Sequence, residues 1–441
     1  MPTPPLVVAL AECFAAGHPS VEEMVVLASR SLGRRWRWLR PLAMRYVARF
    51  DRHSRPRRRE AVRFLLRDEL FADLRRKYAR ELRVENWIAA APPSMQPAEA
   101  AAKWDIPAIT TVGDLAQWLR FDAGKLQWLA DLRGLACKGD ARLGHYHYRA
   151  AIKRSGAIRL IEAPKQRLKA VQRHILEQIL ERIPTHPAAH GFVRGRSIRT
   201  FATPHVGKRV VLRMDVQDFF PTFSAGRIRA FFRTAGYPQS VADLLGGLCT
   251  NAVPPSAWKH LPLDLPGDRL WEARKLYQRP HLPQGAPSSP ALANICAWRI
   301  DRRLARLAEA AGAAYTRYAD DLAFSGDDRF ESSVERFSLH VAAILLEEGF
   351  RANHRKTRIM RRGVRQYLTG MVANDRVNVV RPDFDRLKAT LNNCVRRGPQ
   401  NENRNGHTDF RAHLLGRVGF VESINPEKGN RLRRIFEQIQ W

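Results

Sequence analysis

The sequence predicts an α+β protein whose first part is mainly helical and strongly basic. Three observations predict this class. Residues 1–90 carry apolar side chains at helical spacing among many arginines. The middle of the chain contains short runs typical of strands, at residues 146–161, 210–216 and 314–325. After residue 380 the chain returns to helical spacing, with a basic face and an apolar face formed by Phe384, Leu387, Leu391 and Val395.

The charge of the chain indicates a polyanionic partner. Its 441 residues include 75 lysines and arginines against 43 acidic residues, which gives a net charge of +32. Such an excess is far above what solubility requires and is typical of proteins that bind nucleic acid. A secreted basic protein or a protein bound to a membrane surface would also be basic.

The cysteines and the apolar segments bear on these alternatives. The five cysteines are scattered and include no C-x-x-C pair, which argues against a disulfide framework and against a zinc site. The apolar run near the N-terminus follows no basic residues, so we expect no signal peptide. No run of about 18 uncharged apolar residues occurs, as a spanning helix would need. We therefore expect a cytoplasmic protein with no membrane segment.

The basic N-terminal extension, residues 1–90, is expected to be helical. Its apolar residues predict one helical face from Leu32 to Val47, with Pro41 kinking or restarting the helix. Trp36 and Trp38 lie among arginines and either stack on nucleic-acid bases or belong to the core. The sequence favours neither interpretation. Residues 91–108 are interpreted as a linker.

The next segments alternate between helix and strand signals. Thr111 with Asp114 three residues later resembles a capping box and predicts a helix start. Residues 146–161 predict strands, and residues 166–183 predict a helix. His145 and its neighbours His147 and Tyr148 are interpreted as part of a structural strand, not as metal ligands.

Two segments can bring carboxylates to one point. In the first, residues 210–215 form an apolar strand that ends in Asp215. In the second, two β-prone runs within residues 314–325 are separated by Asp320 and Asp321, which predicts a hairpin with both carboxylates at its tip. Nucleotide transfer to a nucleic-acid 3′ end uses two divalent cations held by carboxylates. The sequence therefore predicts that these three aspartates form a metal site.

A second pair of adjacent acids serves as an internal comparison. Asp327 and Asp328 follow Ser325 and Gly326, and we interpret them as part of a polar loop without a chemical role. Most adjacent aspartates are solvated turn residues. The strand context alone separates the first pair from the second.

Three elements occur in an order that resembles the palm of reverse transcriptases. They are the strand ending at Asp215, the run Leu282-Pro283-Gln284-Gly285-Ala286-Pro287-Ser288-Ser289-Pro290, and the run Tyr318-Ala319-Asp320-Asp321. Two further elements resemble bacterial retron reverse transcriptases. Ala202-Thr203-Pro204-His205 is similar to the retron element Asn-Ala-x-x-His, with Phe201 in the place of Asn, and Leu368-Thr369-Gly370 is similar to Val-Thr-Gly, with Leu368 in the place of Val.

The resemblance covers residue 103 to the end and leaves the first 100 residues without a match. It implies a right-hand polymerase with fingers at 109–208, a palm at 209–366 and a primer grip with a helical thumb at 367–441. An insertion is expected near 251–281. The implied cofactors are two Mg²⁺ ions, or Mn²⁺. The implied partners are deoxynucleoside triphosphates, a cognate non-coding RNA as template and primer, its branched DNA product and, in defence against phage, a separate effector protein.

The resemblance also implies roles for individual residues. The catalytic and metal-binding residues are Asp215, Asp320 and Asp321, with Lys356 as a general acid or, alternatively, an ordinary surface lysine. The expected nucleotide-binding residues are Lys153, Arg159, Phe220 and Gln284. Lys153 and Arg159 are expected to face each other in a basic hairpin at residues 153–159. Phe220 occupies the position of a steric gate against the ribose 2′-hydroxyl, and either Phe219 or Phe220 must belong to the core. The expected nucleic-acid-binding residues are Lys165, Lys169, Arg173, Arg194, Arg196, His205, Thr369 and Gly370.

Two alternatives stay open at this point. A group II intron-like or another defence-associated reverse transcriptase would share the palm elements, although fewer than about 75 residues follow Gly370, too few for maturase and endonuclease regions. A non-catalytic RNA-binding scaffold would explain the charge but not three intact carboxylates.

Overall fold

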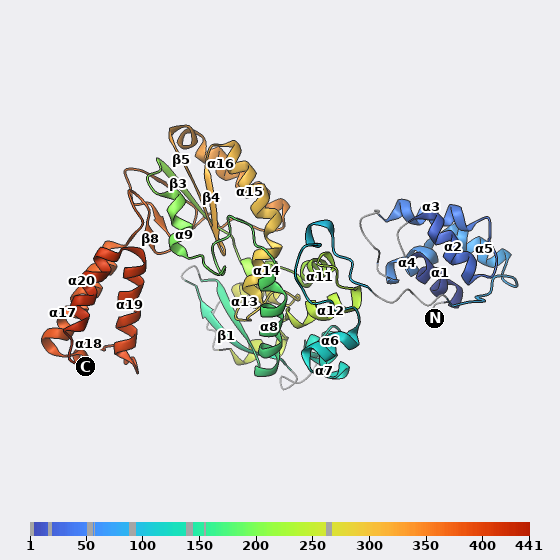
Figure 1. Ribbon diagram of the computed structural model, residues 1–441, viewed down its shortest axis with the longest axis horizontal. Coiled ribbons are helices and arrows are strands. Elements are labelled where there is room, and N and C mark those ends of the chain that lie inside the picture. Colours follow the sequence, from blue (N-terminus) through green and yellow to red (C-terminus); the bar gives the residue numbers. More distant parts are fainter. Residues whose placement is uncertain are drawn as a thin grey trace. The chain divides into compact units, whose positions relative to one another are not determined.

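The computed structural model describes residues 4–15, 20–50, 56, 58–87, 94–137, 144–153, 156–261 and 267–441. The chain forms two compact units (Figure 1). The first unit consists of Met1–Glu99, Ala108–Leu115 and Gly236–Ala242, and the second of Ala100–Pro107, Ala116–Ala235 and Asp243–Trp441. The tip of the predicted basic hairpin, residues 154–155, and part of the predicted linker, residues 91–93, lie outside the described residues.

The first unit is helical, as predicted. It contains α1 (Pro5–Ala15), α2 (Val21–Ser31), α3 (Leu39–Arg49), α4 (Arg58–Arg67) and α5 (Glu69–Lys77), which share one apolar core. Helix α3 begins at Leu39, so Pro41 lies in the first turn, where a backbone N–H has no helical partner to lose.

The two tryptophans of this unit belong to its core. The ring of Trp36 packs against Tyr78, with 5.1 Å between centroids, and the ring of Trp38 packs against Phe71 at 5.6 Å. Trp36 is 9% exposed, and Trp38 packs against the same core cluster. Of the two interpretations that the sequence left open, the structure supports the core.

The predicted capping box is confirmed. Helix α6 (Val112–Leu119) follows Thr111, whose hydroxyl accepts a hydrogen bond from the Asp114 N–H at 3.0 Å, while the Asp114 carboxylate accepts one from the Thr111 N–H at 2.9 Å. Hydrogen bonds from Thr110 and Thr111 lower the pKa of Asp114 to about 2. Helix α7 (Ala123–Ala130) follows directly.

A two-stranded hairpin follows α7 in the second unit. Strands β1 (Tyr146–Ile152) and β2 (Ile158–Pro164) pair antiparallel, and helix α8 (Gln166–Gln178) comes next, all as predicted. His145 is buried, and its ring lies 2.9 Å from the Trp128 carbonyl oxygen, in agreement with a structural role.

The central sheet has the strand order β4-β5-β3-β6 and is antiparallel throughout. Its strands are β3 (Val210–Asp215), β4 (Ala314–Tyr318), β5 (Asp321–Gly326) and β6 (Arg358–Arg361). Helices α15 (Trp298–Ala310) and α16 (Asp328–Glu347) pack against this sheet (Figure 1). Asp327 is the N-cap of α16, so the second acid pair begins a helix and does not lie in the predicted loop.

The remaining helices of the central part are short. They are α9 (Ile198–Ala202), α10 (Phe219–Thr222), α11 (Ala225–Thr234), α12 (Gln239–Leu248), α13 (Gly267–Tyr277) and α14 (Ser289–Cys296). The predicted insertion near 251–281 contains α13 and packs on strand β2, since Trp258 and Tyr277 share an apolar cluster with Ile158 and Leu160. This segment therefore supports the β1–β2 hairpin.

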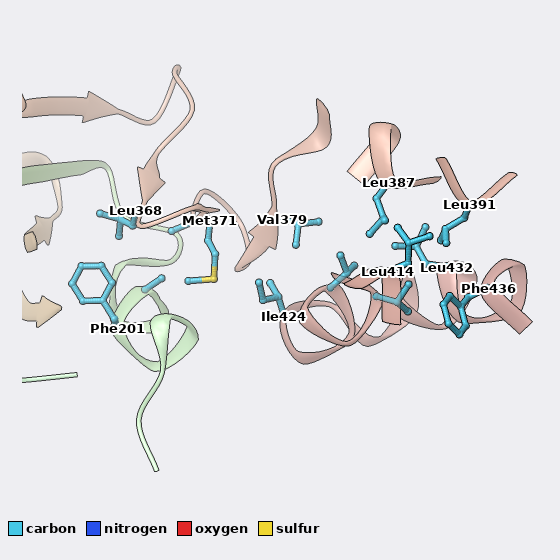
Figure 2. Packing of buried hydrophobic residues seen from close by; sticks show 14 of the residues in the cluster. Phe201, Leu368, Met371, Val379, Leu387, Leu391, Leu414, Ile424, Leu432 and Phe436 are labelled. Carbon is cyan, nitrogen blue, oxygen red and sulfur yellow. The ribbon is translucent and has the colours of Figure 1, made fainter. Parts of the chain in front are cut away.

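The C-terminal part combines a small sheet with helices. Strands β7 (Tyr367–Leu368), β8 (Met371–Val372) and β9 (Asn378–Val379) precede α17 (Arg381–Arg397), α18 (Pro399–Glu402), α19 (Phe410–Ile424) and α20 (Pro426–Glu437). One apolar cluster runs from Phe201 and Leu368 beside the central sheet to Leu414 and Phe436 in the helices (Figure 2). Among the described residues, no helix is long and apolar enough to cross a membrane.

Candidate active site

The three predicted aspartates meet where strands β3 and β5 run side by side. Asp215 ends β3 and lies directly opposite Asp321, the first residue of β5. Asp320 lies in the two-residue turn between β4 and β5, and its carbonyl oxygen accepts a hydrogen bond from the Val216 N–H at 2.8 Å. Only Asp320 is thus at the tip of the hairpin, whereas the sequence predicted both acids there.

The carboxylate of Asp320 is the one without a cationic contact. Among the described residues, no other residue donates a hydrogen bond to it. Burial, followed by the negative charges of Asp215 and Asp321, raises the pKa of Asp320 to about 6. A bound cation would stabilise the ionised form of this carboxylate, because it would compensate both the loss of water and the repulsion by Asp215 and Asp321.

Asp215 is held by a segment that follows helix α16. The Asn353 side-chain amide donates to one carboxylate oxygen at 3.0 Å, and the Lys356 ammonium lies 2.7 Å from the other. The Asn353 N–H also donates to the Asp215 carbonyl oxygen at 2.7 Å. Lys356 was predicted here, but Asn353 was missed, since a single amide in a loop carries no sequence signal.

Asp321 is held from two sides. The Arg213 guanidinium donates to both carboxylate oxygens, with contacts of 2.7, 2.9 and 3.0 Å. The Thr369 hydroxyl donates to Oδ2 of Asp321 at 3.1 Å. Arg213 was missed by sequence reasoning, although strand alternation places its side chain on the same face of β3 as that of Asp215.

The donor chemistry of the site fits a hard cation. Carboxylate oxygens are the ligands that Mg²⁺ prefers, and Asp215 and Asp320 supply them from the end of β3 and from the adjacent turn. Among the described residues, no three His, Cys, Asp or Glu side chains are already grouped as a metal-binding cluster.

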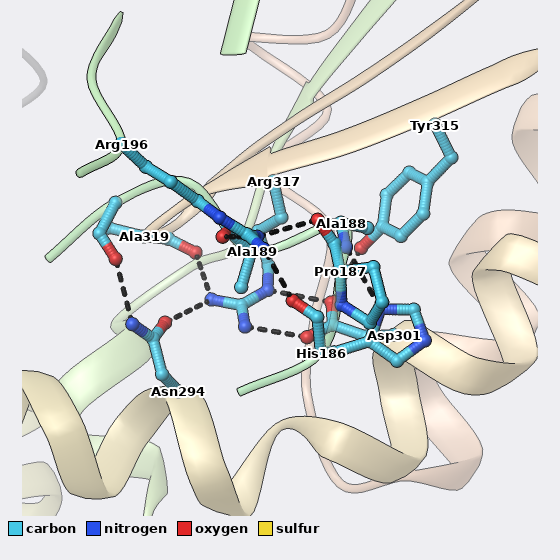
Figure 3. Close-up of polar contacts among 11 residues, drawn as sticks. His186, Pro187, Ala188, Ala189, Arg196, Asn294, Asp301, Tyr315, Arg317 and Ala319 are labelled. Atoms are coloured by element: carbon cyan, nitrogen blue, oxygen red, sulfur yellow. Dashed lines mark hydrogen bonds and ion pairs between the residues drawn. The ribbon is translucent and has the colours of Figure 1, made fainter. Parts of the chain in front are cut away.

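A buried ion pair lies next to the turn between β4 and β5 (Figure 3). Arg317 on β4 is 1% exposed and makes a two-pronged contact with Asp301 of α15, at 2.7 and 2.6 Å. Its guanidinium also donates to the Asn294 side chain at 3.0 Å and to the Ala319 carbonyl oxygen at 3.2 Å. Ala319 has a φ of +54°, so these contacts fix a turn that an alanine rarely adopts.

The loop before helix α9 packs against this turn. The Arg317 N–H donates to the Ala188 carbonyl oxygen at 2.7 Å, so residues 188–190 run beside β4. A Cβ on Gly191 would lie 2.6 Å from the Ala319 nitrogen, which explains the glycine. Arg196 donates to the carbonyl oxygens of this loop (Figure 3), a structural role that the prediction of nucleic-acid binding did not include.

The prediction that His205 contacts nucleic acid is wrong. His205 is fully buried, with ring nitrogens 2.6 Å from the Ser325 hydroxyl and 2.7 Å from the Thr316 hydroxyl. Burial lowers the pKa of His205 to about 3, so the ring is neutral at physiological pH. It joins β4 to β5 inside the fold, because Thr316 and Ser325 belong to these two strands.

Two of the predicted nucleotide-binding residues, Phe220 and Lys153, lie at the segment that follows β3. Phe219 is core, whereas Phe220 is half-buried, with its ring centroid 6.3 Å from that of Phe192. The Lys153 ammonium lies 3.1 Å from the Asp218 carboxylate. Arg159 is paired with Ala151, so it is a diagonal neighbour of Lys153 and does not face it as predicted.

Gln284 and Gly285 lie against strand β2. The Gln284 carbonyl oxygen accepts a hydrogen bond from the Glu162 N–H at 2.8 Å. Gly285 has a φ of +125°, and a Cβ there would lie 3.1 Å from the Glu162 carbonyl oxygen. Gly285 therefore allows the backbone of this loop to lie close to strand β2 of the same chain.

The predicted template-binding residues are mostly accessible. Lys169 and Arg173 are exposed one turn apart on α8, and Lys165 precedes that helix. Arg194 is exposed in the loop before α9. Gly370 follows Thr369 in the β7–β8 turn with a φ of +89°.

The sequence was also compared with known proteins. A profile of the family "Reverse transcriptase (RNA-dependent DNA polymerase)" matches residues 151–372. The chain is 40% identical over 368 residues to the retron Mx65 reverse transcriptase of Myxococcus xanthus, which covers 82% of this chain and 79% of that protein. It is 36% identical over 329 residues to the retron Mx162 reverse transcriptase of the same organism, covering 71% of this chain and 64% of that protein.

A retron reverse transcriptase from another organism is also similar to this chain. The retron Ec86 reverse transcriptase of Escherichia coli is 29% identical over 284 residues, which cover 64% of this chain and 77% of that protein. The central sheet, its three aspartates and these similarities lead to one conclusion. The chain belongs to the reverse transcriptase family and is an RNA-directed DNA polymerase of the bacterial retron type.

Proposed function

We propose that this polymerase copies part of a structured non-coding RNA into single-stranded DNA that stays joined to the RNA through a branch. Priming from an internal RNA 2′-hydroxyl would give such a product. The similarity to retron reverse transcriptases over most of the chain carries the proposal. We further propose a role in defence against phage, together with a separate effector protein.

In this proposal Asp215, Asp320 and Asp321 hold two Mg²⁺ ions, for which Mn²⁺ can substitute. When bound, the ions activate the attacking hydroxyl and neutralise the triphosphate. Support comes from the position of the three carboxylates at one strand end and from the uncompensated charge of Asp320.

Lys356 is proposed as the general acid that protonates the leaving pyrophosphate. Its ammonium already lies 2.7 Å from Asp215 and is 52% exposed, so it is beside the reacting centre and accessible to a ligand. The same ammonium balances the charge of Asp215 when no nucleotide is present.

The remaining assignments follow the proposed right-hand organisation. Fingers at 109–208 would place Lys153 and Arg159 near the triphosphate and Lys165, Lys169, Arg173, Arg194 and Arg196 near the template backbone. The palm at 209–366 would supply Phe220 and Gln284 to the nucleotide. The primer grip and thumb at 367–441 would bring Thr369 and Gly370 to the primer side.

Nucleic acid that copurifies with the full-length protein tests this proposal. We expect one abundant RNA covalently joined to DNA, which sequencing before and after treatment with a debranching enzyme would identify. A group II intron-like or other defence-associated reverse transcriptase would instead yield unbranched DNA. Recovery of linear DNA only would therefore reject the retron product while leaving the polymerase activity in place.

Phe220→Ala is expected to increase incorporation of ribonucleotides by about tenfold or more relative to deoxyribonucleotides, because the ring would no longer exclude the 2′-hydroxyl. Its half-buried position beside Phe192 supports the assignment. Single-nucleotide primer extension with matched ribo- and deoxyribonucleotides measures the ratio. An unchanged ratio in a folded variant would remove Phe220 from the gate.

A further inference from the structure

We propose that Arg213 and a divalent cation compete for the Asp321 carboxylate, with Thr369 as its fixed partner, so that these two positioning residues set the metal affinity of the site. The inference rests on the proposed function, in which Asp321 is a metal ligand. It concerns residues outside the predicted catalytic set.

The charges at the strand ends explain why Arg213 is needed. Asp215 and Asp321 lie directly opposite each other on antiparallel strands, where like charges repel. Lys356 contacts the first carboxylate and Arg213 the second, whereas Asp320 has no such partner in the part of the chain that the structure describes. Within that part, two cationic side chains therefore contact the three carboxylates.

The geometry shows that Asp321 is fully engaged. Three contacts from Arg213 and one from Thr369 occupy both oxygens, and a carboxylate has about four acceptor sites. A metal ion can reach Asp321 only if one of these donors withdraws. Arg213 is the donor that can withdraw, since its side chain is 23% exposed and ends a flexible stem.

Thr369 is fixed by its backbone. It has a φ of +43°, a left-handed conformation that is rare for a β-branched residue, at the turn between β7 and β8. Leu368 and Met371 on either side of this turn are fully buried in the core that continues into the C-terminal helices. The turn thus holds the hydroxyl in place, and the strain is balanced by this packing.

Binding of Mn²⁺ alone to the full-length protein, measured by electron paramagnetic resonance, tests the competition. Arg213→Gln removes the competitor and is expected to tighten Mn²⁺ binding about tenfold, the effect expected for losing charge-assisted hydrogen bonds to one carboxylate. Arg213→Lys keeps the charge but loses the two-pronged contact, so it should tighten binding by a smaller factor.

Arg358→Gln is the matched control. Arg358 lies opposite Arg213 on the neighbouring strand and is exposed. Its guanidinium donates hydrogen bonds to the carbonyl oxygens of Arg355 and Thr357 and to no other described residue. Arg358→Gln removes one positive charge, as Arg213→Gln does, but leaves the hydrogen bonds between Arg213 and Asp321 in place. Equal tightening by Arg358→Gln and Arg213→Gln would overturn the proposal in favour of a simple charge effect, as would no tightening by either Arg213 variant.

Three more variants, at Thr369 and Asp320, test the fixed partner and the metal site separately. Thr369→Val is expected to weaken Mn²⁺ binding several-fold, because the Asp321 carboxylate loses the fixed donor that holds its orientation. Thr369→Ser keeps the hydroxyl and should stay near the wild type. Equal affinities for both variants would remove Thr369 from the proposal. Asp320→Asn should abolish Mn²⁺ binding whatever the role of Arg213. Retained Mn²⁺ binding in Asp320→Asn would instead count against the proposed metal site itself.

Discussion

Replacing Asp320 by asparagine is expected to reduce deoxynucleotide incorporation by at least about 1,000-fold, because the charge that a metal ion stabilises in the transition state is worth several kcal/mol. Asparagine has nearly the same shape, so the turn should survive. The side chain has no ion pair to lose among the described residues, and its raised pKa of about 6 shows that the folded protein holds its charge at a cost. Primer extension on an RNA template measures the loss.

Asp328→Asn is the matched control for this experiment. Asp328 belongs to the second acid pair of the chain and contacts Arg209 at 2.9 Å, with its side chain 85% exposed. An exposed ion pair of this kind contributes less than about 1 kcal/mol, so activity should stay at the wild-type level. If Asp320→Asn were as active as Asp328→Asn, the proposed metal site would be wrong.

Asp320→Asn should also be at least as stable as the wild type at neutral pH. The folded-state pKa of Asp320, about 6, lies above its ordinary value of 3.8, so the folded protein loses stability as the pH rises from the lower value through the higher one, and the loss is complete at neutral pH. Asparagine cannot ionise and avoids this cost. A loss of activity combined with unchanged or raised stability would separate a chemical role from a structural one.

The sequence was most informative where local pattern and chain order agree. The apolar run ending at Asp215 and the two β-prone runs around Asp320 became β3, β4 and β5, with boundaries close to those expected. Helical spacing identified α17, but there Cys394 is buried and Val395 is 40% exposed, although Val395 was assigned to the apolar face. An error of one residue in the helical phase is enough to exchange Cys394 and Val395 between the buried and the exposed face.

The contacts that hold the site could not be predicted in the same way. Asn353, Arg213 and Arg317 act on residues between 2 and 138 positions away, and only the folded sheet brings them together. The error for His205 has the same origin. A histidine in a family element suggested contact with nucleic acid, but its position behind the sheet depends on the packing of α9 against β4, which the sequence pattern does not reveal.

The buried ion pair of Arg317 and Asp301, next to the turn between β4 and β5, leads to the second large effect. Arg317→Met is expected to destabilise the second unit by about 3–5 kcal/mol, because it leaves Asp301 as an uncompensated charge in the interior. Both side chains of the pair are at most 1% exposed. Denaturant unfolding followed by circular dichroism measures the change. Arg182→Met is the control, since its partner Asp105 is 94% exposed and the pair should contribute less than about 1 kcal/mol.

The double variant Arg317→Met with Asp301→Asn tests the cause. The asparagine removes the buried charge, and its carbonyl oxygen can still accept the hydrogen bond that the Tyr315 hydroxyl donates to Asp301 at 2.8 Å. We expect it to recover more than half of the lost stability, since an unpaired charge costs more than an unpaired amide. Activity should nevertheless stay low, because the Ala319 carbonyl oxygen loses its Arg317 donor in both variants and the turn that carries Asp320 is no longer fixed. Recovery of activity along with stability would mean that the pair supports the fold but does not position the turn.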